Sequence, residues 1–404
     1  KSLTRLFQYG EFPYDRFFFW SWLAILVWAP IPLGSNRAWA WSLLELLTFG
    51  LAAGWLICFA FGKVAVTEPF RRAKWFLVLL GLWIIYQGLF ILPMPQAWLA
   101  ILSPEAAAVH DSLRLGFNQS TWMALSVDTH ASRTSWFKSL LYVVSFAMTL
   151  LVITNRDRAK RFAYVLVIFA LALAVYGLML HLTEYSHSWF GTTLSHGSRA
   201  IATYVNPNHF AGFLEMTLAI GIGLLIAGLR GGQAQTWKQF LKHVLEWIFS
   251  PKMRLRLMLC VLVIALVATH SRMGNTAFFA SMIIAGVIGL AFSRHATRGT
   301  VVLLVSLIAI DVFIVGSWFG LEKLANRIEQ TSVAYRPNES TESVETRAEP
   351  ARYGVDLIAD YPMFGAGPGS WYVAFPRYRG GDLSSFFDYA HNDFVQFVAE
   401  SGLI

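Results

Sequence analysis

Long apolar stretches, separated by shorter polar segments, make up most of this chain. They lie at roughly 17–33, 38–61, 75–92, 135–154, 161–182, 209–229, 256–270, 273–292 and 300–319. A helix needs about 17–25 residues to cross the hydrocarbon core of a bilayer, and most of these stretches come close to that length. A further apolar run begins at His391 and reaches Ile404. The pattern therefore predicts nine membrane-spanning helices and the beginning of a tenth.

The composition supports this interpretation. Of the 404 residues, 56% are hydrophobic and only 14% are charged, whereas about a quarter of the residues of a soluble domain are charged. We therefore expect an all-α, polytopic membrane protein surrounded by membrane lipids. In a soluble chain, the net charge of +8 could indicate nucleic-acid binding. Here most of that charge falls in alternate loops, where it acts as a topology signal, so no nucleic-acid partner is expected.

Basic residues occur in every second loop, and basic residues in short loops stay on the cytoplasmic side. They follow the second, fourth, sixth and eighth predicted spans, at 63–74, 156–161, 230–256 and 294–298. The other loops, at 34–37, 93–134, 183–208, 271–272 and 320–390, are then predicted to face outward. This divides the chain into a helical bundle at 1–319, an outer loop subdomain at 320–390 and the start of a tenth span at 391–404.

Two segments on the predicted outer side stand out, one for a helical pattern and one for its glycines. Residues 92–133 begin with Pro-Met-Pro and continue with a helical pattern in which Trp98 and Ile101 are apolar, as in a helix that lies at the membrane interface. The turn 365–369 is rich in glycine, but no Lys-Ser/Thr follows it and it contains Gly-Pro. It therefore does not have the form of a phosphate-binding loop.

Arginine and asparagine gather where predicted spans meet the outer side. Arg199 precedes Asn206-Pro207-Asn208-His209, and we expect Asn208 to cap the following helix, whose positive end attracts phosphate. Arg272 lies in the very short turn after the seventh span, where it is either a snorkelling membrane anchor or a rigid cation for bidentate phosphate contacts. Arg37, in the turn after the first span, is a weaker candidate of the same kind.

His391 stands where the last apolar run begins. With Asn392 and Asp393 it could simply form the cap of a helix at the membrane interface. Imidazole, however, titrates near neutral pH and is the usual group for taking a proton from a sugar hydroxyl. We therefore interpret His391 as a candidate general base.

Several motifs, taken in order, resemble the superfamily of O-antigen ligases and O-antigen polymerases. They are Pro32-Leu33-Gly34, Ser126-Val127-Asp128, the segment 206–212, Ser271-Arg272, the segment 361–369, His391-Asn392-Asp393 and Glu400-Ser401-Gly402. The resemblance implies a bacterial inner-membrane glycosyltransferase of the GT-C type, with about twelve spans and a long periplasmic loop. It implies an undecaprenyl-pyrophosphate-linked glycan as donor. The acceptor would be a sugar of the lipid A core in a ligase, another lipid-linked repeat in a polymerase, or a protein hydroxyl in the related oligosaccharyltransferases.

The resemblance also assigns roles to residues. It implies that Arg199 and Arg272 are the functional arginines and that His391 is the loop histidine. Asn206, Asn208 and Arg37 are then additional candidates for the pyrophosphate site. No Asp-x-Asp pair of the kind that holds a metal in nucleotide-sugar enzymes occurs in the chain, so we expect arginine to replace the metal and no cofactor to be needed. A lipid-glycan transporter is the alternative from another functional class.

Overall fold

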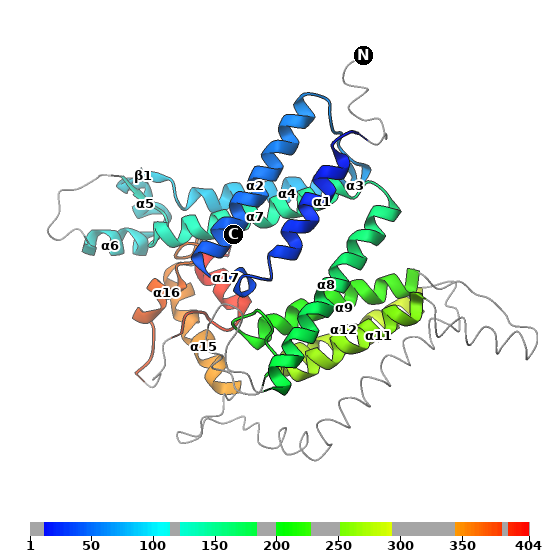
Figure 1. Cartoon of the computed structure of the whole chain (residues 1–404). Coiled ribbons are helices and arrows are strands. Elements are labelled where there is room, and N and C mark those ends of the chain that lie inside the picture. Colours follow the sequence, from blue (N-terminus) through cyan, green and yellow to red (C-terminus); the bar gives the residue numbers. More distant parts are fainter. Residues whose placement is uncertain are drawn as a thin grey trace, which may run out of the picture. The chain divides into compact units, whose positions relative to one another are not determined.

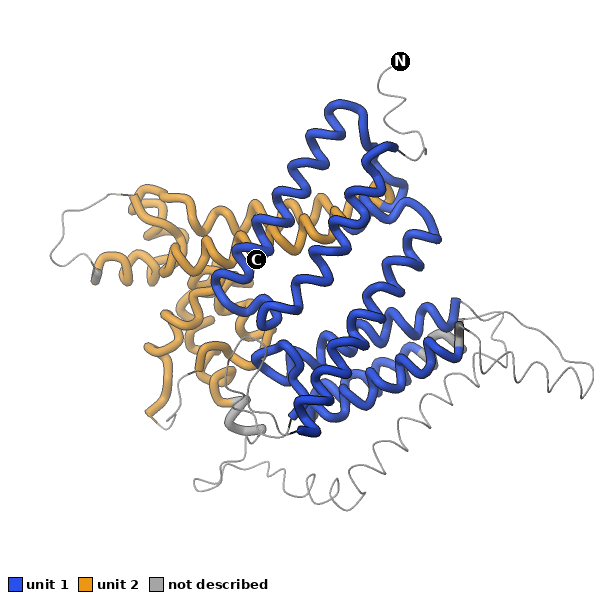
Figure 2. Tube along the Cα trace, in the orientation of Figure 1, with its two compact units in different colours: residues 1–69, 149–323 blue, residues 70–148, 324–404 orange. Residues whose placement is uncertain are grey.

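The computed structural model describes residues 12–113, 122–183, 199–227, 251–292, 344–381 and 387–403. Within these ranges the chain is almost entirely helical (Figure 1), and the strands are limited to β1 (Pro93–Pro95) and β2 (Trp122–Ala124). The chain forms two compact units, residues 1–69 with 149–323 and residues 70–148 with 324–404 (Figure 2). The expected all-α class is confirmed.

The first unit is a bundle of long apolar helices. Its elements are α1 (Asp15–Trp28), η2 (Leu33–Ser35), α2 (Ala38–Ala60), α8 (Arg156–Leu182), α9 (Pro207–Ala227), α11 (Pro251–Ala268) and α12 (Arg272–Phe292). Helices α8, α9 and α11 pack on one another around buried side chains such as Phe210, Leu214 and Leu262. At Gly221, α9 approaches α11 so closely that a Cβ there would lie 2.3 Å from Leu259 Cδ2. Helix α12 packs against α9 and α11.

The second unit combines apolar helices with the segment after residue 324. It contains α4 (Lys74–Leu89), α5 (Gln96–Leu102), α6 (Pro104–Leu113), most of α7 (Thr129–Val152), α15 (Val344–Asp360), α16 (Trp371–Ala374), η3 (Phe375–Arg377) and α17 (Asp393–Ser401); the short α3 (Glu68–Arg72) precedes α4. Strands β1 and β2 pair antiparallel, with Met94 opposite Met123. The core includes Phe90, Leu357 and Trp371, and the Trp371 and Phe375 rings stack at 4.5 Å.

Helices lie where the apolar pattern predicts spans. Eight of the nine predicted stretches coincide with α1, α2, α4, α7, α8, α9, α11 and α12, and the ninth, 300–319, lies outside the described residues. Among the described helices, α2, α7, α8 and α9 are long and apolar enough to cross a membrane. The protein is therefore a polytopic helical membrane protein, whereas the number of its spans stays a prediction.

The predicted division of the chain at 319 and 390 stays a prediction. Residues 344–381 and 387–403 belong to one unit with α4 and most of α7, and buried side chains of α5, α6, β2, α15, α16 and α17 share one core. Helix α17 is shorter than the predicted apolar run of 391–404. It has nine residues and ends before Gly402, whose φ of 79° stops the helix.

Candidate functional site

The turn between α11 and α12 is as short as the sequence predicts. Helix α11 ends at Ala268 and α12 begins at Arg272. His270 has a positive φ of 52°, a left-handed conformation that costs a non-glycine residue about 1–2 kcal/mol. Ser271 Oγ accepts a hydrogen bond from the Gly274 N–H at 3.2 Å, and so caps α12. Arg272 is thereby fixed as the first residue of a 21-residue helix.

Arg199 is tied to this same turn. Its Nε donates to the carbonyl oxygen of Thr269 at 3.0 Å, and its Nη2 donates to that of His270, also at 3.0 Å. The neighbouring Ala200 N–H donates to the carbonyl of Ala268 at 2.9 Å. The chain before α9 therefore runs beside the α11–α12 turn, and the two arginines singled out from the sequence belong to one local structure.

The start of α9 corrects one expectation. Asn206, rather than Asn208, caps the helix: its Oδ1 accepts the Asn208 N–H at 2.8 Å, and its carbonyl accepts the N–H of His209 and Phe210. Pro207 is the first helical residue, which suits proline because its missing N–H is not needed there. Both asparagines are residues that commonly cap helices, so the sequence pattern alone did not exclude Asn208. Because the helix begins at Pro207, only Asn206 stands in the cap position.

The first turns of α9 and α12 lie against each other. A Cβ at Gly274 would lie 2.9 Å from the Ala211 Cβ and 2.8 Å from Glu215 Oε1, so this glycine allows the two helices to approach. Both helices begin at the same end of the first unit, near Arg199. A positive helix end favours anions, so the start of α12, whose preceding turn binds Arg199, is a candidate anion site.

The turn that leads to Arg37 packs on the segment between Arg199 and Asn206. Thr203 Oγ1 donates to the Pro30 carbonyl at 2.7 Å, and a Cβ at Gly34 would lie 2.6 Å from a carbon of the Tyr204 ring. Burial raises the pKa of the Tyr204 phenol, which keeps it neutral. Arg37 itself is exposed and is the N-cap residue of α2. The structure thus brings together the chain segments that carry all five candidate residues of the donor site.

His391 belongs to the second unit and immediately precedes the cap of α17. Asn392 Oδ1 accepts the N–H groups of Phe394 and Val395 at 3.1 and 3.2 Å, as the sequence predicts for a cap. His391 has a φ of 52°, its side chain is exposed, and its ring meets the Phe387 ring edge-on with centroids 6.0 Å apart. The tight turn presents the imidazole instead of burying it in the core.

Glu400 is a residue to which sequence reasoning gave no role. Its carboxylate accepts the N–H of Gly369 at 2.8 Å, the N–H of Trp371 at 3.2 Å and the Gln396 amide at 3.2 Å. The N–H groups of the glycine-rich turn are therefore bound by this internal carboxyl group, and burial raises the pKa of Glu400. The hydrogen bond from the Gly367 N–H to the Glu400 carbonyl, at 2.9 Å, fixes the turn to α17 a second time.

A polar cluster joins α6 to the segment after α15. Arg377 forms an ion pair with Glu105, and the Tyr378 hydroxyl donates to Asp360 Oδ2 at 2.7 Å. Burial, followed by the negative charge of Glu105, raises the pKa of Tyr361 to about 12. Because the ion pair is exposed, its contribution to stability is small.

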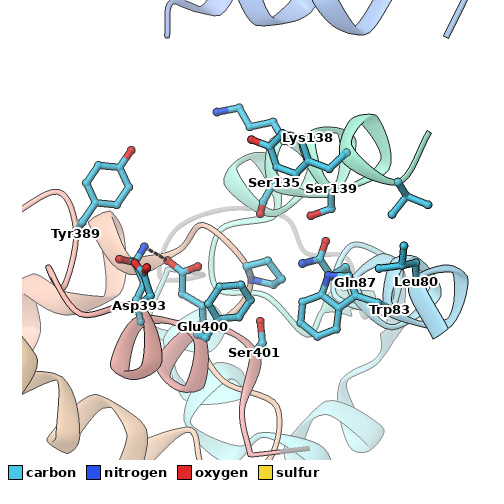
Figure 3. A pocket seen from close by; sticks show the side chains of 15 residues that line it. Leu80, Trp83, Gln87, Ser135, Lys138, Ser139, Tyr389, Asp393, Glu400 and Ser401 are labelled. Carbon is cyan, nitrogen blue, oxygen red and sulfur yellow. Dashed lines mark hydrogen bonds between the residues drawn. The ribbon is translucent and has the colours of Figure 1, made fainter. Parts of the chain in front are cut away.

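A cavity of about 530 Å³ lies within the second unit, among α4, α7 and α17. Gln87 of α4, Ser135 and Ser139 of α7, and Asp393 and Glu400 of α17 surround the same space (Figure 3). Glu400 thus connects the glycine turn to the wall of this cavity. No local sequence pattern predicts the cavity, because its lining residues come from helices that are far apart along the chain.

The fold and these polar turns define an integral membrane protein of the polytopic helical class. Residues 257–404 match the family model described as O-antigen ligase. This part of the chain is therefore similar to the O-antigen ligase family, in agreement with the resemblance seen in the motifs. The matched range contains Arg272, His391 and Glu400. A search of curated proteins and a search of solved structures gave no match.

Proposed function

We propose that the protein transfers an O-antigen glycan from undecaprenyl pyrophosphate to a sugar of the lipid A core, on the periplasmic face of the bacterial inner membrane. The observation that carries the proposal is the position of Arg272 at the first residue of α12, in a turn to which Arg199 is hydrogen-bonded. A cation gains nothing from the positive end of a helix dipole. Its presence there is explained if the place binds a strongly charged anion.

The donor half of the reaction follows from this charge. Breaking the bond between the anomeric carbon and the phosphate oxygen leaves negative charge on the pyrophosphate. Arg199, Arg272 and the N-terminal end of α9, with Asn206 and Asn208, would stabilise that charge as it develops, with Arg37 on the adjoining turn. A guanidinium has five N–H groups, and the bonds from Arg199 to the two backbone carbonyls use two of them. Arg199 is therefore proposed to bind the pyrophosphate as well as the turn.

The acceptor half is assigned to His391. Its exposed imidazole would take the proton of the acceptor hydroxyl as that oxygen attacks the anomeric carbon. Attack from the face opposite the pyrophosphate inverts the anomeric centre. Electrostatic stabilisation by arginine takes the place of a divalent metal in this scheme, so the reaction is proposed to be metal-independent.

The test is a reconstituted transfer assay with purified protein, lipid-linked glycan and rough lipopolysaccharide. The wild type is expected to add the glycan to the lipid A core, with and without a metal chelator. Removing a charge-assisted hydrogen bond costs about 1.5–3 kcal/mol, so Arg272→Ala is expected to slow transfer about ten- to a hundredfold or more. His391→Ala is expected to lower kcat while donor binding is kept.

Three other results would each overturn the proposal. Product on lipid-linked repeats alone would make the protein a polymerase. Loss of activity with the chelator would contradict the metal-independent mechanism. Movement of the lipid-linked glycan across the bilayer without any transfer product would indicate a transporter.

A further inference from the structure

The cavity of the second unit has walls that suit a sugar. Trp83 of α4 and Phe397 of α17 line it together, with ring centroids 6.1 Å apart. A sugar ring carries C–H groups on its faces and hydroxyls at its edge, so it fits a wall that combines aromatic rings with polar groups. The volume of about 530 Å³ lies in the range of small-molecule sites, about 300–1,000 Å³.

Gln87 provides the cavity with a buried hydrogen-bond acceptor. Its side chain is 4% exposed, lines the cavity, and its buried Oε1 accepts no hydrogen bond from any described residue. Leaving a buried acceptor without a partner costs about 1–3 kcal/mol. A hydroxyl donor that entered the cavity would recover this energy, whereas the acyl chain of a lipid would not.

The negative side of the cavity is built by α17. Asp393 and Glu400 lie on its wall (Figure 3), and carboxyl oxygens accept hydrogen bonds from sugar hydroxyls. Glu400 already accepts two backbone N–H groups, which hold its orientation. Asp393 is the first residue of α17 and is exposed.

The cavity adjoins the candidate base along the chain. Tyr389 and Asp393, two residues before and two residues after His391, both line it. Consecutive Cα atoms are about 3.8 Å apart, so each of these residues lies within about 8 Å of His391 along the backbone. A general base must lie within hydrogen-bonding reach of the hydroxyl that it deprotonates, which places the acceptor at this end of α17.

We infer that this cavity is the acceptor subsite, and that it binds the sugar whose hydroxyl is glycosylated. The inference rests on the proposed function and adds the residues that recognise the acceptor. Gln87 and Asp393 bind hydroxyl groups, and Trp83 with Phe397 packs on the ring face. The sugar belongs either to the lipid A core or to the end of a second lipid-linked glycan, since both present the same hydroxyl chemistry.

The test compares Gln87→Leu and Asp393→Asn with the wild type in the transfer assay, with each acceptor in a separate arm. Both variants are expected to raise the acceptor KM about tenfold, the effect of losing roughly one hydrogen bond, with the donor KM unchanged. Core oligosaccharide freed from lipid A should bind each variant correspondingly more weakly in calorimetry. Gln96→Leu is the matched control, because Gln96 lies in the same unit, bonded to Asp111 and away from the cavity.

The outcomes separate the two proposals. If the wild type transfers no glycan in either arm, the proposed function fails. If the wild type is active and both variants keep its acceptor KM, the subsite is wrong while the function stands. A raised KM only toward lipid-linked glycan supports the subsite and makes the enzyme a polymerase. Asp393 is exposed, so Asp393→Asn remains informative even if Gln87→Leu does not fold.

Discussion

At the residue scale, Arg199 has a structural role beside the one proposed for it in donor binding. The guanidinium of Arg199 bonds two successive carbonyls of the α11–α12 turn, so this residue also builds the turn that carries Arg272. Only a planar, forked donor can reach both oxygens in this way. Position 199 therefore requires the forked shape of the guanidinium as well as its positive charge.

The first prediction separates charge from geometry at this position. Arg199→Lys keeps the charge but cannot hold both carbonyls, so we expect transfer to slow about tenfold or more. The apparent melting temperature of the purified protein should fall as well. Arg133→Lys, at an exposed position, is the control and should change neither. Wild-type activity in Arg199→Lys would show that the charge alone is enough.

The second prediction concerns Gly402. Its φ is 79°, and a Cβ there would lie 2.0 Å from the Met363 carbonyl oxygen. We expect Gly402→Ala to destabilise the protein by about 2 kcal/mol or more, from backbone strain and overpacking together. Gly381→Ala, where nothing lies within 4 Å, should melt like the wild type in the same thermal denaturation. Equal melting of both variants would contradict the packing described for this turn.

At the element scale, α5 has an apolar face that the unit does not cover. Trp98 and Ile101 are 64% and 79% exposed, whereas Leu99 is fully buried. A helix with such a face, next to a spanning segment, is expected to lie in the membrane interface with the exposed side chains toward lipid. This agrees with the interpretation of the sequence pattern in this segment.

The third prediction tests the placement of α5. A spin label at Ile101→Cys, in a protein with Cys58 and Cys260 replaced by alanine, should be accessible to oxygen and shielded from a polar nickel complex in liposomes. The same label at Ser112→Cys, on the exposed side of α6, should show the reverse. Equal access of the nickel complex to both labels would place α5 in water.

At the scale of the whole molecule, the proposed reaction depends on the predicted topology. Both the 271–272 turn and the segment before α17 are expected on the periplasmic side, because basic loops alternate with them. The substrates of the proposed reaction are lipid-linked and exposed on that side. A reversed orientation would leave the candidate residues without a donor.

The fourth prediction tests this orientation. In the cysteine-free protein, Gly381→Cys should react with an impermeant maleimide in intact spheroplasts. Lys63→Cys, on the exposed loop after α2, should react only in inside-out vesicles. Labelling of Lys63→Cys from outside would reverse the topology.

The sequence by itself determined the class of protein and the order of its helices, because burial in lipid requires long apolar stretches and these can be counted along the chain. It also singled out Arg199, Arg272 and His391 as candidates, whose roles stay a prediction, since charged and titratable groups at helix ends stand out against an apolar background. Only the tertiary structure decided that Asn206 rather than Asn208 caps α9, that Arg199 bonds the α11–α12 turn, and that Glu400 fills the glycine turn. These depend on contacts between segments far apart in sequence. The α17 cavity is the clearest case, because Gln87 and Asp393 come from distant helices and no local pattern relates them.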